Sequence, residues 1–303
     1  MFRRANQQDK RVIFDLYAKQ PVIHESQDDY FNCSFIAKNT IVNEINGHVV
    51  ASLQHDYHKV MFNDLQIVTS VIFAQFSDRT KPSRALENLR AEAIKQESYK
   101  TLFTFINCDN NKEYQKYGFD AVYYKRAYSL NKKDFKEITY SCVSKDFNVD
   151  ELLRVYRKFT EKFTGYFYRD RDYYVNLIDL LQSKRGNLAC CYDSENKCVG
   201  YMIYFIDSSK VIVKELIYLN GYALSKLLSY CLRIKEDILV YVSNNEDLSK
   251  IFGKVPYKKV ISTLVKINDF DLFNKLFACK VSSSITAFKQ DKRPLFLSDF
   301  RYM

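Results

Sequence analysis

Residues 67–119 constrain the fold more than any other part of this chain, because a strand pattern, a basic turn, a helix pattern and a second strand pattern follow in that order. The run Ile67–Phe73 is rich in apolar β-branched residues, which is typical of a buried strand. The polar run Asp78–Lys81 then ends it. The segment therefore predicts a strand–turn–helix–strand unit.

The helix after this turn is indicated by one apolar stripe and by a permitted start. Pro82 stands where a first-turn position tolerates proline. Four apolar residues recur at helical spacing and form the stripe: Leu86, Leu89, Ala93 and Ile94. The stripe predicts that one face of the helix packs against the sheet.

The turn itself is suited to bind an anion. A strand-to-helix turn directs unpaired backbone N–H groups and the positive end of the helix dipole outward. The residues expected to bind an anion there are Arg79, Thr80, Lys81, Ser83 and Arg84. Arginine and lysine beside free amides favour a pyrophosphate. The alternative is a turn that only connects the two elements.

The same stretch resembles the GNAT superfamily of N-acetyltransferases. Their acetyl-CoA motif, Arg/Gln-x-x-Gly-x-Gly/Ala after a strand, begins here at Arg79. A later motif of the superfamily, Tyr-x-x-x-Gly-Phe, is matched by Tyr114, Gly118 and Phe119. The start of the chain fits as well, with a helical DKRVIFDLYAK and an Asn46-Gly47 hairpin signal between two strand patterns.

The second half is similar to the tandem-GNAT acetyltransferases of the enhanced intracellular survival (Eis) family. GYFYRDRDYYVNLI resembles the Arg-x-x-x-Tyr/Trp helix of that family. CVGYMIYFIDSSKVIVKELIYLNGYALSKLLSYC resembles its strand–strand–helix segment, and KVISTLVKINDFDLFNKL the strand and helix that follow. The likeness covers most of the chain, and the collinear order of the motifs carries it.

Two departures from the family pattern have consequences. Pro82 replaces a glycine of the pyrophosphate loop and has no N–H, and Arg84 replaces a small residue. One lost charge-assisted hydrogen bond costs about 1.5–3 kcal/mol, or roughly one to two orders of magnitude in CoA affinity. In addition, only about 40 residues follow the strand at Val260, too few for the family's sterol-carrier-like domain. We expect a reduced remnant there.

The resemblance implies an α+β fold made of two tandem GNAT-like units, each a mixed, mostly antiparallel sheet flanked by helices, plus a short C-terminal extension. We expect an N-terminal GNAT domain with the acetyl-CoA site at 1–132, a second GNAT-like domain without the cofactor motif at 133–258, and a reduced segment at 259–303. At 303 residues, two domains is also the expectation from length alone.

Composition excludes several other classes of protein. Hydrophobic residues make up 47% and charged residues 27%, which describes a folded chain rather than a disordered one. No apolar run of about 18 residues is present, and the polar N-terminus lacks a signal peptide, so we expect a cytoplasmic protein without a membrane span. The eight cysteines show no metal-ligand spacing, and we expect no metal. The net charge of +10 is scattered and comes with no nucleic-acid-binding motif, so no specific nucleic acid is expected.

The resemblance also assigns roles at the acetyl-CoA site. Backbone groups around Ile72, Phe73 and Ala74 would hold the pantetheine and steady the oxyanion. Tyr114 matches the tyrosine that protonates the departing thiolate, and with a reference pKa of about 10 it carries its proton at neutral pH. Tyr117 is the nearby alternative for this role. Both rings could instead only pack beneath the sheet.

An alkyl amine of pKa about 10.4 must lose a proton before it attacks a thioester. In Eis-like enzymes the C-terminal carboxylate serves as the base, which here would belong to Met303. The acidic residues Glu25, Asp28 and Asp29 lie in the region that borders the acceptor in GNAT folds, and they could attract a cationic amine. Their plainer interpretation is a capped helix start.

These inferences predict an acetyl-CoA-dependent N-acetyltransferase acting on a primary amine of the aminoglycoside, polyamine or lysine type. The acceptor is thus a small molecule or a peptide, and Eis-like proteins suggest a homo-hexamer. The alternative is a non-catalytic GNAT-like binding module whose CoA loop has degenerated through Pro82 and Arg84.

Overall fold

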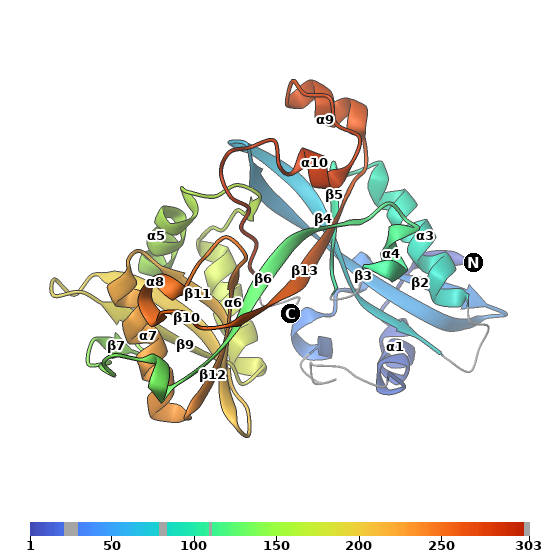
Figure 1. The fold of residues 1–303 in the computed structure, drawn as a ribbon. Helices are drawn as coiled ribbons and strands as arrows, with labels where there is room; N and C mark the ends of the chain where they lie inside the picture. Colours follow the sequence, from blue (N-terminus) through green and yellow to red (C-terminus); the bar gives the residue numbers. More distant parts are fainter. Residues whose placement is uncertain (21–29, 79–83, 109–110, 300–303) are drawn as a thin grey trace. The chain divides into compact units, whose positions relative to one another are not determined.

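The computed structural model describes residues 1–20, 30–78, 84–108 and 111–299 (Figure 1). The packing of the backbone divides the chain into two compact units. Unit 1 comprises the described parts of Met1–Val60, Gln66–Val122 and Thr263–Gln290, and unit 2 comprises Met61–Leu65, Tyr123–Ser262 and the described residues from Asp291 onward. The expected domain limits at residues 132 and 258 stay a prediction.

Unit 1 is a mixed sheet with strands in the order β1-β2-β3-β4-β5-β13. β4 and β5 run parallel, whereas β1 with β2, β2 with β3, and β5 with β13 pair antiparallel. The elements that lie wholly or partly in unit 1 are β1 (Phe2–Arg4), α1 (Asp9–Ala18), β2 (Thr40–Ile45), β3 (His48–Phe62), β4 (Leu65–Ser77), α3 (Ala85–Ser98), β5 (Phe103–Asn107), α4 (Lys112–Gln115), β13 (Tyr257–Ile267), α9 (Phe270–Leu276) and α10 (Ser284–Ala287).

Helices cover both faces of this sheet. Val42 on β2 packs in a cluster with Ile13 and Leu16 of α1. Its neighbour Asn43, which points to the other face because side chains alternate along a strand, donates a hydrogen bond to the carbonyl of Ala85 at the start of α3. Of the expected α3 stripe, Leu89, Ala93 and Ile94 are buried. The helix therefore sits where its sequence pattern predicted.

Asn46 and Gly47 form the two-residue loop of a β-hairpin between β2 and β3. Ile45 and His48 pair as the last residues of β2 and the first of β3. Asn46 and Gly47 have φ angles of 52° and 76°. Positive φ at both central residues defines the type I′ turn, whose twist matches that of the strands on either side.

Unit 2 contains parallel and antiparallel strands in the order β6-β12-β11-β10-β9-β7. β11 and β12 run parallel, and the other pairs in this sheet are antiparallel. The elements are β6 (Asp120–Asn131), β7 (Val143–Ser144), α5 (Val149–Thr160), β8 (Tyr166–Phe167), α6 (Arg171–Ser183), β9 (Asn187–Tyr192), β10 (Cys198–Ile206), β11 (Lys210–Tyr218), α7 (Gly221–Ile234), β12 (Asp237–Ser243) and α8 (Ser249–Phe252).

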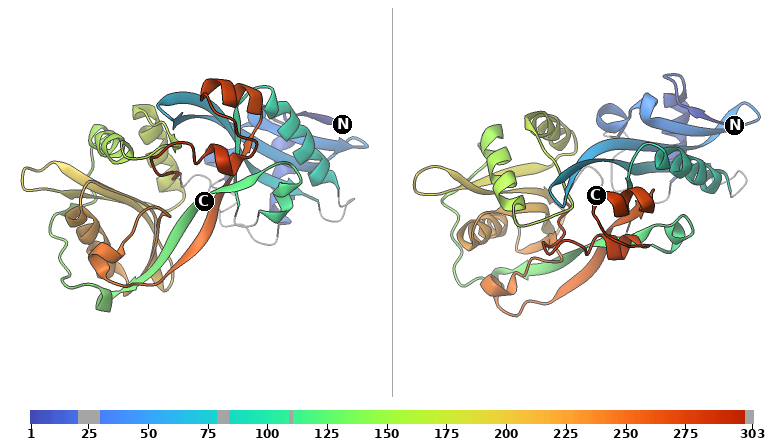
Figure 2. Two further views of the ribbon diagram at one scale, coloured as in Figure 1. Left: turned by 45° about the horizontal axis from the view of Figure 1, so that its top comes forward. Right: turned by 90° about the horizontal axis from the view of Figure 1, so that it is seen from above.

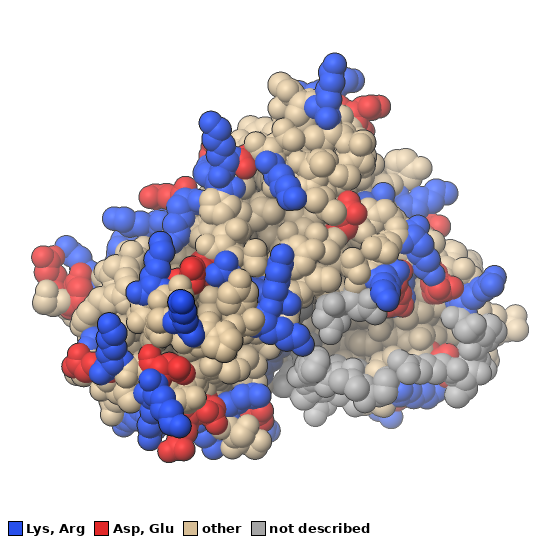
Figure 3. All heavy atoms as spheres, in the orientation of Figure 1, with Lys and Arg blue, Asp and Glu red and all other residues tan. Residues whose placement is uncertain are grey.

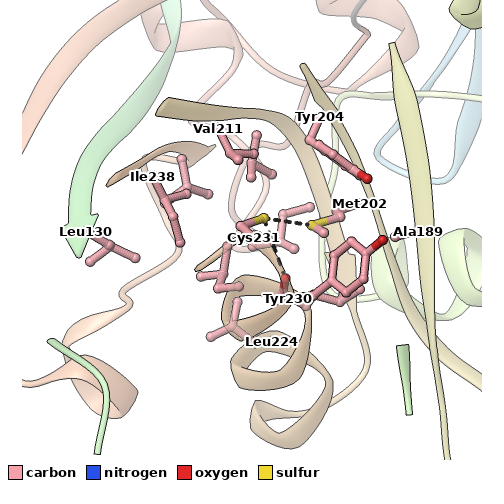
Figure 4. Close-up of a cluster of buried hydrophobic side chains, with 14 of the residues drawn as sticks. Leu130, Ala189, Met202, Tyr204, Val211, Leu224, Tyr230, Cys231 and Ile238 are labelled. Atoms are coloured by element: carbon pink, nitrogen blue, oxygen red, sulfur yellow. Dashed lines mark hydrogen bonds between the residues drawn. The ribbon is translucent and has the colours of Figure 1, made fainter. Parts of the chain in front are cut away.

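The two faces of the unit 2 sheet are covered by different helices. Figure 4 shows the face under α7, where Leu224, Tyr230 and Cys231 of the helix lie against Met202 of β10 and Ile238 of β12. On the other face, α5 and α6 pack against the strands through a second buried cluster (Figure 2). Both clusters are built from alternate residues of the same strands, so the sheet is a buried middle layer.

The fold is thus α+β, with mixed sheets flanked by helices as the sequence predicted. Five residues expected to line one face of the first helix of the second half are all buried on α5: Leu152, Leu153, Val155, Tyr156 and Phe159. Among the described helices, none is long and apolar enough to cross a membrane.

Candidate functional site

The candidate site lies in unit 1, where β4 and β5 stop pairing. Their parallel ladder runs from Thr69 opposite Phe103 to Ile72 opposite Ile106. β4 then continues to Ser77, whereas β5 ends at Asn107. β4 therefore extends past its ladder with β5, at the carboxyl end of a parallel pair. In sheets with parallel strands, this end is where ligands bind.

Ala74 gives the site its unusual backbone. Its φ angle is 50°, inside a strand and at a residue other than glycine. This conformation costs on the order of 1–3 kcal/mol and is found mostly where the surrounding structure and function require it. Ile72 is buried, and the side chains of Phe73 and Ala74 pack against the α1 cluster. The three residues expected to hold a pantetheine therefore lie at the point where β4 leaves β5.

A helix N-terminus follows β4 along the chain. α3 begins at Ala85, directly after Arg84, whose side chain is exposed. The dipole of this helix favours an anion at that end. The other residues of the predicted pyrophosphate turn, Arg79, Thr80, Lys81 and Ser83, lie outside the described residues, as does Pro82.

Tyr114 on α4 reaches the same part of β4. Its ring is buried, and its hydroxyl oxygen lies 3.1 Å from Nε2 of Gln75, the residue after Ala74. Burial raises the pKa of Tyr114 to about 12, with Glu113 and Cys108 also raising it and Arg90 and Gln75 lowering it. The phenol is therefore protonated at neutral pH and able to donate its proton.

The alternative tyrosine has a different environment. The hydroxyl of Tyr117 donates a hydrogen bond to the backbone carbonyl of Glu87 on α3, at 3.2 Å. It thus ties α4 to α3. Of the two tyrosines, Tyr114 is the one whose hydroxyl lies beside Gln75 of β4.

The Tyr-x-x-x-Gly-Phe spacing has a local structural reason. The N–H of Gly118 bonds to the carbonyl of Gln115, and the N–H of Phe119 to that of Tyr114, which closes the end of α4. Gly118 has a φ angle of 84°. A glycine accepts this left-handed conformation without strain. The motif therefore ends α4 at Gln115, directly after Tyr114, and leads the chain through Gly118 into β6.

Two residues of the site were not expected from the sequence. Nε of Arg90, on α3, donates to Oε1 of Gln75 at 2.5 Å, and Arg90 also forms an ion pair with Glu113. The Arg90 guanidinium carbon lies 5.0 Å from the centre of the Tyr114 ring. The available signal was a charge on a buried helix face, because Arg90 stands one turn after Leu86 in the apolar stripe.

Four further residues were predicted to belong to the site. Glu25, Asp28 and Asp29, expected near the acceptor, and Met303, expected as the base, lie outside the described residues. Within the described ranges, no group of three or more His, Cys, Asp or Glu side chains is arranged to hold a metal ion.

Unit 2 repeats the strand arrangement of the site. The parallel ladder of β11 and β12 runs from Lys210 opposite Asp237 to Val213 opposite Val240, and β11 continues to Tyr218. A register shift between β10 and β11 follows at once and leaves Lys214 as an extra residue. In place of a basic turn, Asn220 caps α7 by accepting the N–H of Ala223 at 2.9 Å. The connection to the helix is therefore short and already hydrogen-bonded.

A buried ion pair lies beside this second divergence of strands. Arg169 and Glu215 make two parallel hydrogen bonds of 2.8 and 2.7 Å, with side chains 0% and 1% exposed. The Arg169 guanidinium carbon stacks 4.0 Å from the centre of the Tyr156 ring. Burial lowers the pKa of Arg169, but the Glu215 carboxylate and the neighbouring Tyr173, Tyr156 and Tyr174 together raise it well above its usual value, so Arg169 keeps its charge.

The C-terminal segment of the chain packs against the same region of unit 2. Arg169 donates to the carbonyl of Ser298 at 2.7 Å, and Ser243 and Asn245 both donate to the carbonyl of Leu295. Phe296 is buried in the cluster beneath α5 and α6. In unit 2, therefore, side chains next to the divergent strands bind the chain's own tail.

Glu246 is a buried carboxyl group in unit 2 with a measurable consequence. Burial raises its pKa to about 7 from 4.5, while the Ser243 N–H, Tyr218, Lys162 and Lys125 lower it. The folded protein holds the proton of Glu246 more tightly than the unfolded chain does, because the folded-state pKa is raised. The contribution of Glu246 to the free energy of unfolding is therefore fully present below the unfolded pKa of 4.5 and is lost as the pH rises through 7. Glu246→Gln should remove this loss.

We expect the unfolding free energy of the native protein to fall when the pH is raised from about 5 to about 7.5. This fall should exceed that of the Glu246→Gln variant by up to about 3 kcal/mol. Urea titrations of both proteins at the two pH values measure the difference. Lys125, whose pKa burial lowers to about 8, titrates mostly above this window. Equal pH dependence of the two proteins would mean that Glu246 is charged in the folded state throughout.

Charge over the molecular surface shows no single dominant region on the face in Figure 3. Lys and Arg side chains are spread over this face, and Asp and Glu side chains stand among them. A nucleic-acid-binding surface is usually a continuous basic patch or stripe. This face does not have that distribution.

Comparison with known proteins agrees with the geometry of both units. Residues 165–249, within unit 2, match a family model described as an acetyltransferase (GNAT) domain. A search of curated proteins found no match.

Several solved structures have the same fold over most of this chain. A conserved protein from Enterococcus faecalis, described as a probable N-acyltransferase, is 16% identical with a TM-score of 0.71, covering 88% of this chain and 72% of its own. A GCN5-related N-acetyltransferase from Anabaena variabilis is 12% identical, with a TM-score of 0.72 and coverages of 89% and 73%. Eis1 from Mycobacterium abscessus is 13% identical, with a TM-score of 0.63 and coverages of 90% and 75%. The chain therefore has the fold of GNAT N-acetyltransferases, and its residues 165–249 are similar to a GNAT acetyltransferase domain.

Proposed function

We propose that this protein is an acetyl-CoA-dependent N-acetyltransferase of the Eis-like tandem-GNAT type, with its cofactor site in unit 1. The observation that carries the proposal is the coincidence of three features at one place. β4 leaves β5 at Ile72, a helix begins at Ala85 just beyond the end of β4, and the Tyr114 hydroxyl lies beside Gln75 in between.

Each feature matches a requirement of acetyl transfer. The part of β4 that extends past its ladder with β5 would hold the pantetheine as an added strand holds its neighbour. The start of α3, with Arg84 and the predicted basic residues Arg79 and Lys81, would bind the pyrophosphate. Tyr114 would give its proton to the thiolate that leaves when the amine attacks. Acetyl-CoA supplies the thioester, and no metal is required.

The acceptor is proposed to be a primary amine, of the aminoglycoside, polyamine or lysine type. Glu25, Asp28 and Asp29 would attract its positive charge, and the carboxylate of Met303 or one of these acids would remove its proton. The proposal also places the protein in the cytoplasm and, by its likeness to Eis, in a homo-hexamer.

Calorimetric titration with acetyl-CoA tests the proposal directly. We expect a Kd in the micromolar range, weakened by Pro82. Arg79→Ala should weaken binding about tenfold or more, because a charge-assisted bond to phosphate is lost. Arg157→Ala, which removes an exposed arginine from α5 of unit 2, is the matched control and should leave the Kd unchanged.

The alternative function has its own outcome in this titration. If acetyl-CoA does not bind at millimolar concentration, and Pro82→Gly does not restore binding, the protein is a non-catalytic GNAT-like module. If Pro82→Gly alone creates tight binding, the loop of the native protein has lost its cofactor and kept its architecture.

A further inference from the structure

The environment of Tyr114 contains two polar side chains that the proposed function does not yet use. Gln75 follows the left-handed residue Ala74 on β4, and Arg90 lies on the buried face of α3. We propose that Gln75 and Arg90 are positioning residues for acetyl transfer, an inference that rests on the proposed function. Arg90 fixes the orientation of the Gln75 amide. Gln75 then donates a hydrogen bond to the Tyr114 oxygen, so that the phenol proton is directed to the leaving thiolate.

The orientation of the Gln75 amide follows from the chemistry of arginine. A guanidinium can only donate hydrogen bonds, so the amide atom that it contacts must be the oxygen. Nε of Arg90 lies 2.5 Å from this atom, Oε1. The NH₂ group of Gln75 is then the donor that remains for Tyr114, and Nε2 lies 3.1 Å from the phenol oxygen. The Tyr114 hydroxyl also donates to Oε1, at the longer distance of 3.3 Å, since an amide oxygen accepts two hydrogen bonds. Once the phenol proton has left, only the hydrogen bond from Nε2 remains.

This arrangement favours the phenolate that proton donation creates. As the O–H proton leaves, negative charge grows on the oxygen, and the hydrogen bond from Gln75 strengthens. The Arg90 guanidinium, 5.0 Å from the ring centre, adds a favourable charge interaction. The other groups that face Tyr114 are Glu113 on α4 and Cys108 after β5, and both oppose the phenolate. Glu113 is in turn held by Arg90, which reduces its effect.

Tyr114 needs neighbours that stabilise its phenolate, because its pKa is higher than that of the thiol it must protonate. Burial raises the pKa of Tyr114 to about 12, whereas an alkyl thiol has a pKa of about 8.5. Proton transfer from this phenol to a thiolate is therefore uphill. Arg90 and Gln75 are the neighbours that lower the pKa of Tyr114, and without them the phenol would be a still weaker acid.

The step balances as follows. The amine nitrogen forms a bond to the acetyl carbon, and the carbon–sulfur bond of the thioester breaks, leaving its electron pair on sulfur. The thiolate takes the proton of the Tyr114 hydroxyl and leaves as CoA thiol. As the amide forms, the attacking nitrogen releases one N–H proton to solvent. The phenolate, held by Gln75, takes one proton back from solvent before the next turnover, so the cycle has no net gain or loss of protons.

The experiment places 3,5-difluorotyrosine at position 114 and follows its ionisation by ¹⁹F NMR. This phenol is more acidic than tyrosine, so it titrates in a milder pH range, and the single label removes overlap with the other tyrosines. Gln75→Leu should raise the pKa of the probe by about one unit or more. The matched control is Gln115→Leu, an exposed glutamine beside Tyr114 on α4, which should leave the pKa unchanged.

Kinetics on unlabelled proteins complete the test. Gln75→Leu should lower kcat about 10- to 100-fold with little change in the KM for acetyl-CoA. Gln75→Glu keeps the contact with Arg90 and therefore the local packing, but it places a carboxylate beside the phenolate, so it should raise the probe pKa further and lower kcat more. An active enzyme whose probe pKa and kcat do not respond to either substitution overturns the inference. A shifted pKa in a protein that transfers no acetyl group overturns the proposed function instead.

Discussion

Tyr114→Phe is expected to lower kcat by about 100-fold or more while acetyl-CoA affinity is retained. The substitution removes only the hydroxyl, so the ring still fills its buried position beside Phe119. The lost hydrogen bond to Gln75 should cost the fold only about 1 kcal/mol. What disappears is the proton donor for the thiolate. Steady-state kinetics with acetyl-CoA and an amine acceptor, beside calorimetric binding of acetyl-CoA, separate the two effects.

Tyr117→Phe is the matched control for this prediction. It removes a phenol hydroxyl three residues away that binds the backbone carbonyl of Glu87. We expect at most a few-fold change in kcat. Equal losses for the two variants would show that the hydroxyls act through the packing of α4, and unchanged turnover in Tyr114→Phe would rule out its role as the acid.

Glu215→Gln is expected to destabilise unit 2 by about 3–5 kcal/mol, the largest effect on stability that we predict. The substitution keeps the shape of the side chain but leaves the Arg169 guanidinium buried without a counter-charge. Two further groups depend on the pair, because Tyr201 donates to Glu215 and Arg169 donates to the carbonyl of Ser298. Urea unfolding and differential scanning calorimetry measure the loss.

An exposed ion pair in the same unit provides the comparison. Glu195 and Lys197 approach to 2.7 Å with side chains 71% and 65% exposed. Glu195→Gln should change the unfolding free energy by less than about 1 kcal/mol, since solvent screens the pair. If Glu215→Gln costs no more than this, the buried pair is either solvated or neutral. The double variant Arg169→Met, Glu215→Leu should recover part of the loss, because it buries no unpaired charge.

The local structure of this protein follows closely from its sequence. The apolar run that begins at Ile67 lies within β4, the stripe around Leu89 and Ala93 is the buried face of α3, and Asn46-Gly47 forms the hairpin. In each case the signal is contained within a few residues. Periodicity and turn chemistry act over that same range, so the sequence alone could predict these elements.

Part of the candidate site was also within reach of the sequence. Tyr114 and Gly118 were expected from a motif whose spacing is set by the end of one short helix. The resemblance to GNAT acetyltransferases assigned Ile72, Phe73 and Ala74 to the pantetheine, and that role stays a prediction. The left-handed φ of Ala74 was not expected, since alanine carries no local preference for it.

By itself, then, the sequence determined the order of strands and helices, the hairpin and the helix end beside Tyr114. Only the tertiary structure decided which polar side chains meet. Arg90 reaches Gln75 across 15 positions of the chain, Arg169 reaches Glu215 across 46, and the carbonyl of Ser298 is bound from 129 positions away. Contacts of this kind depend on the pairing of whole strands and the packing of helices on them. No repeat or spacing along the chain encodes them, because the partners become neighbours only once the sheets have formed.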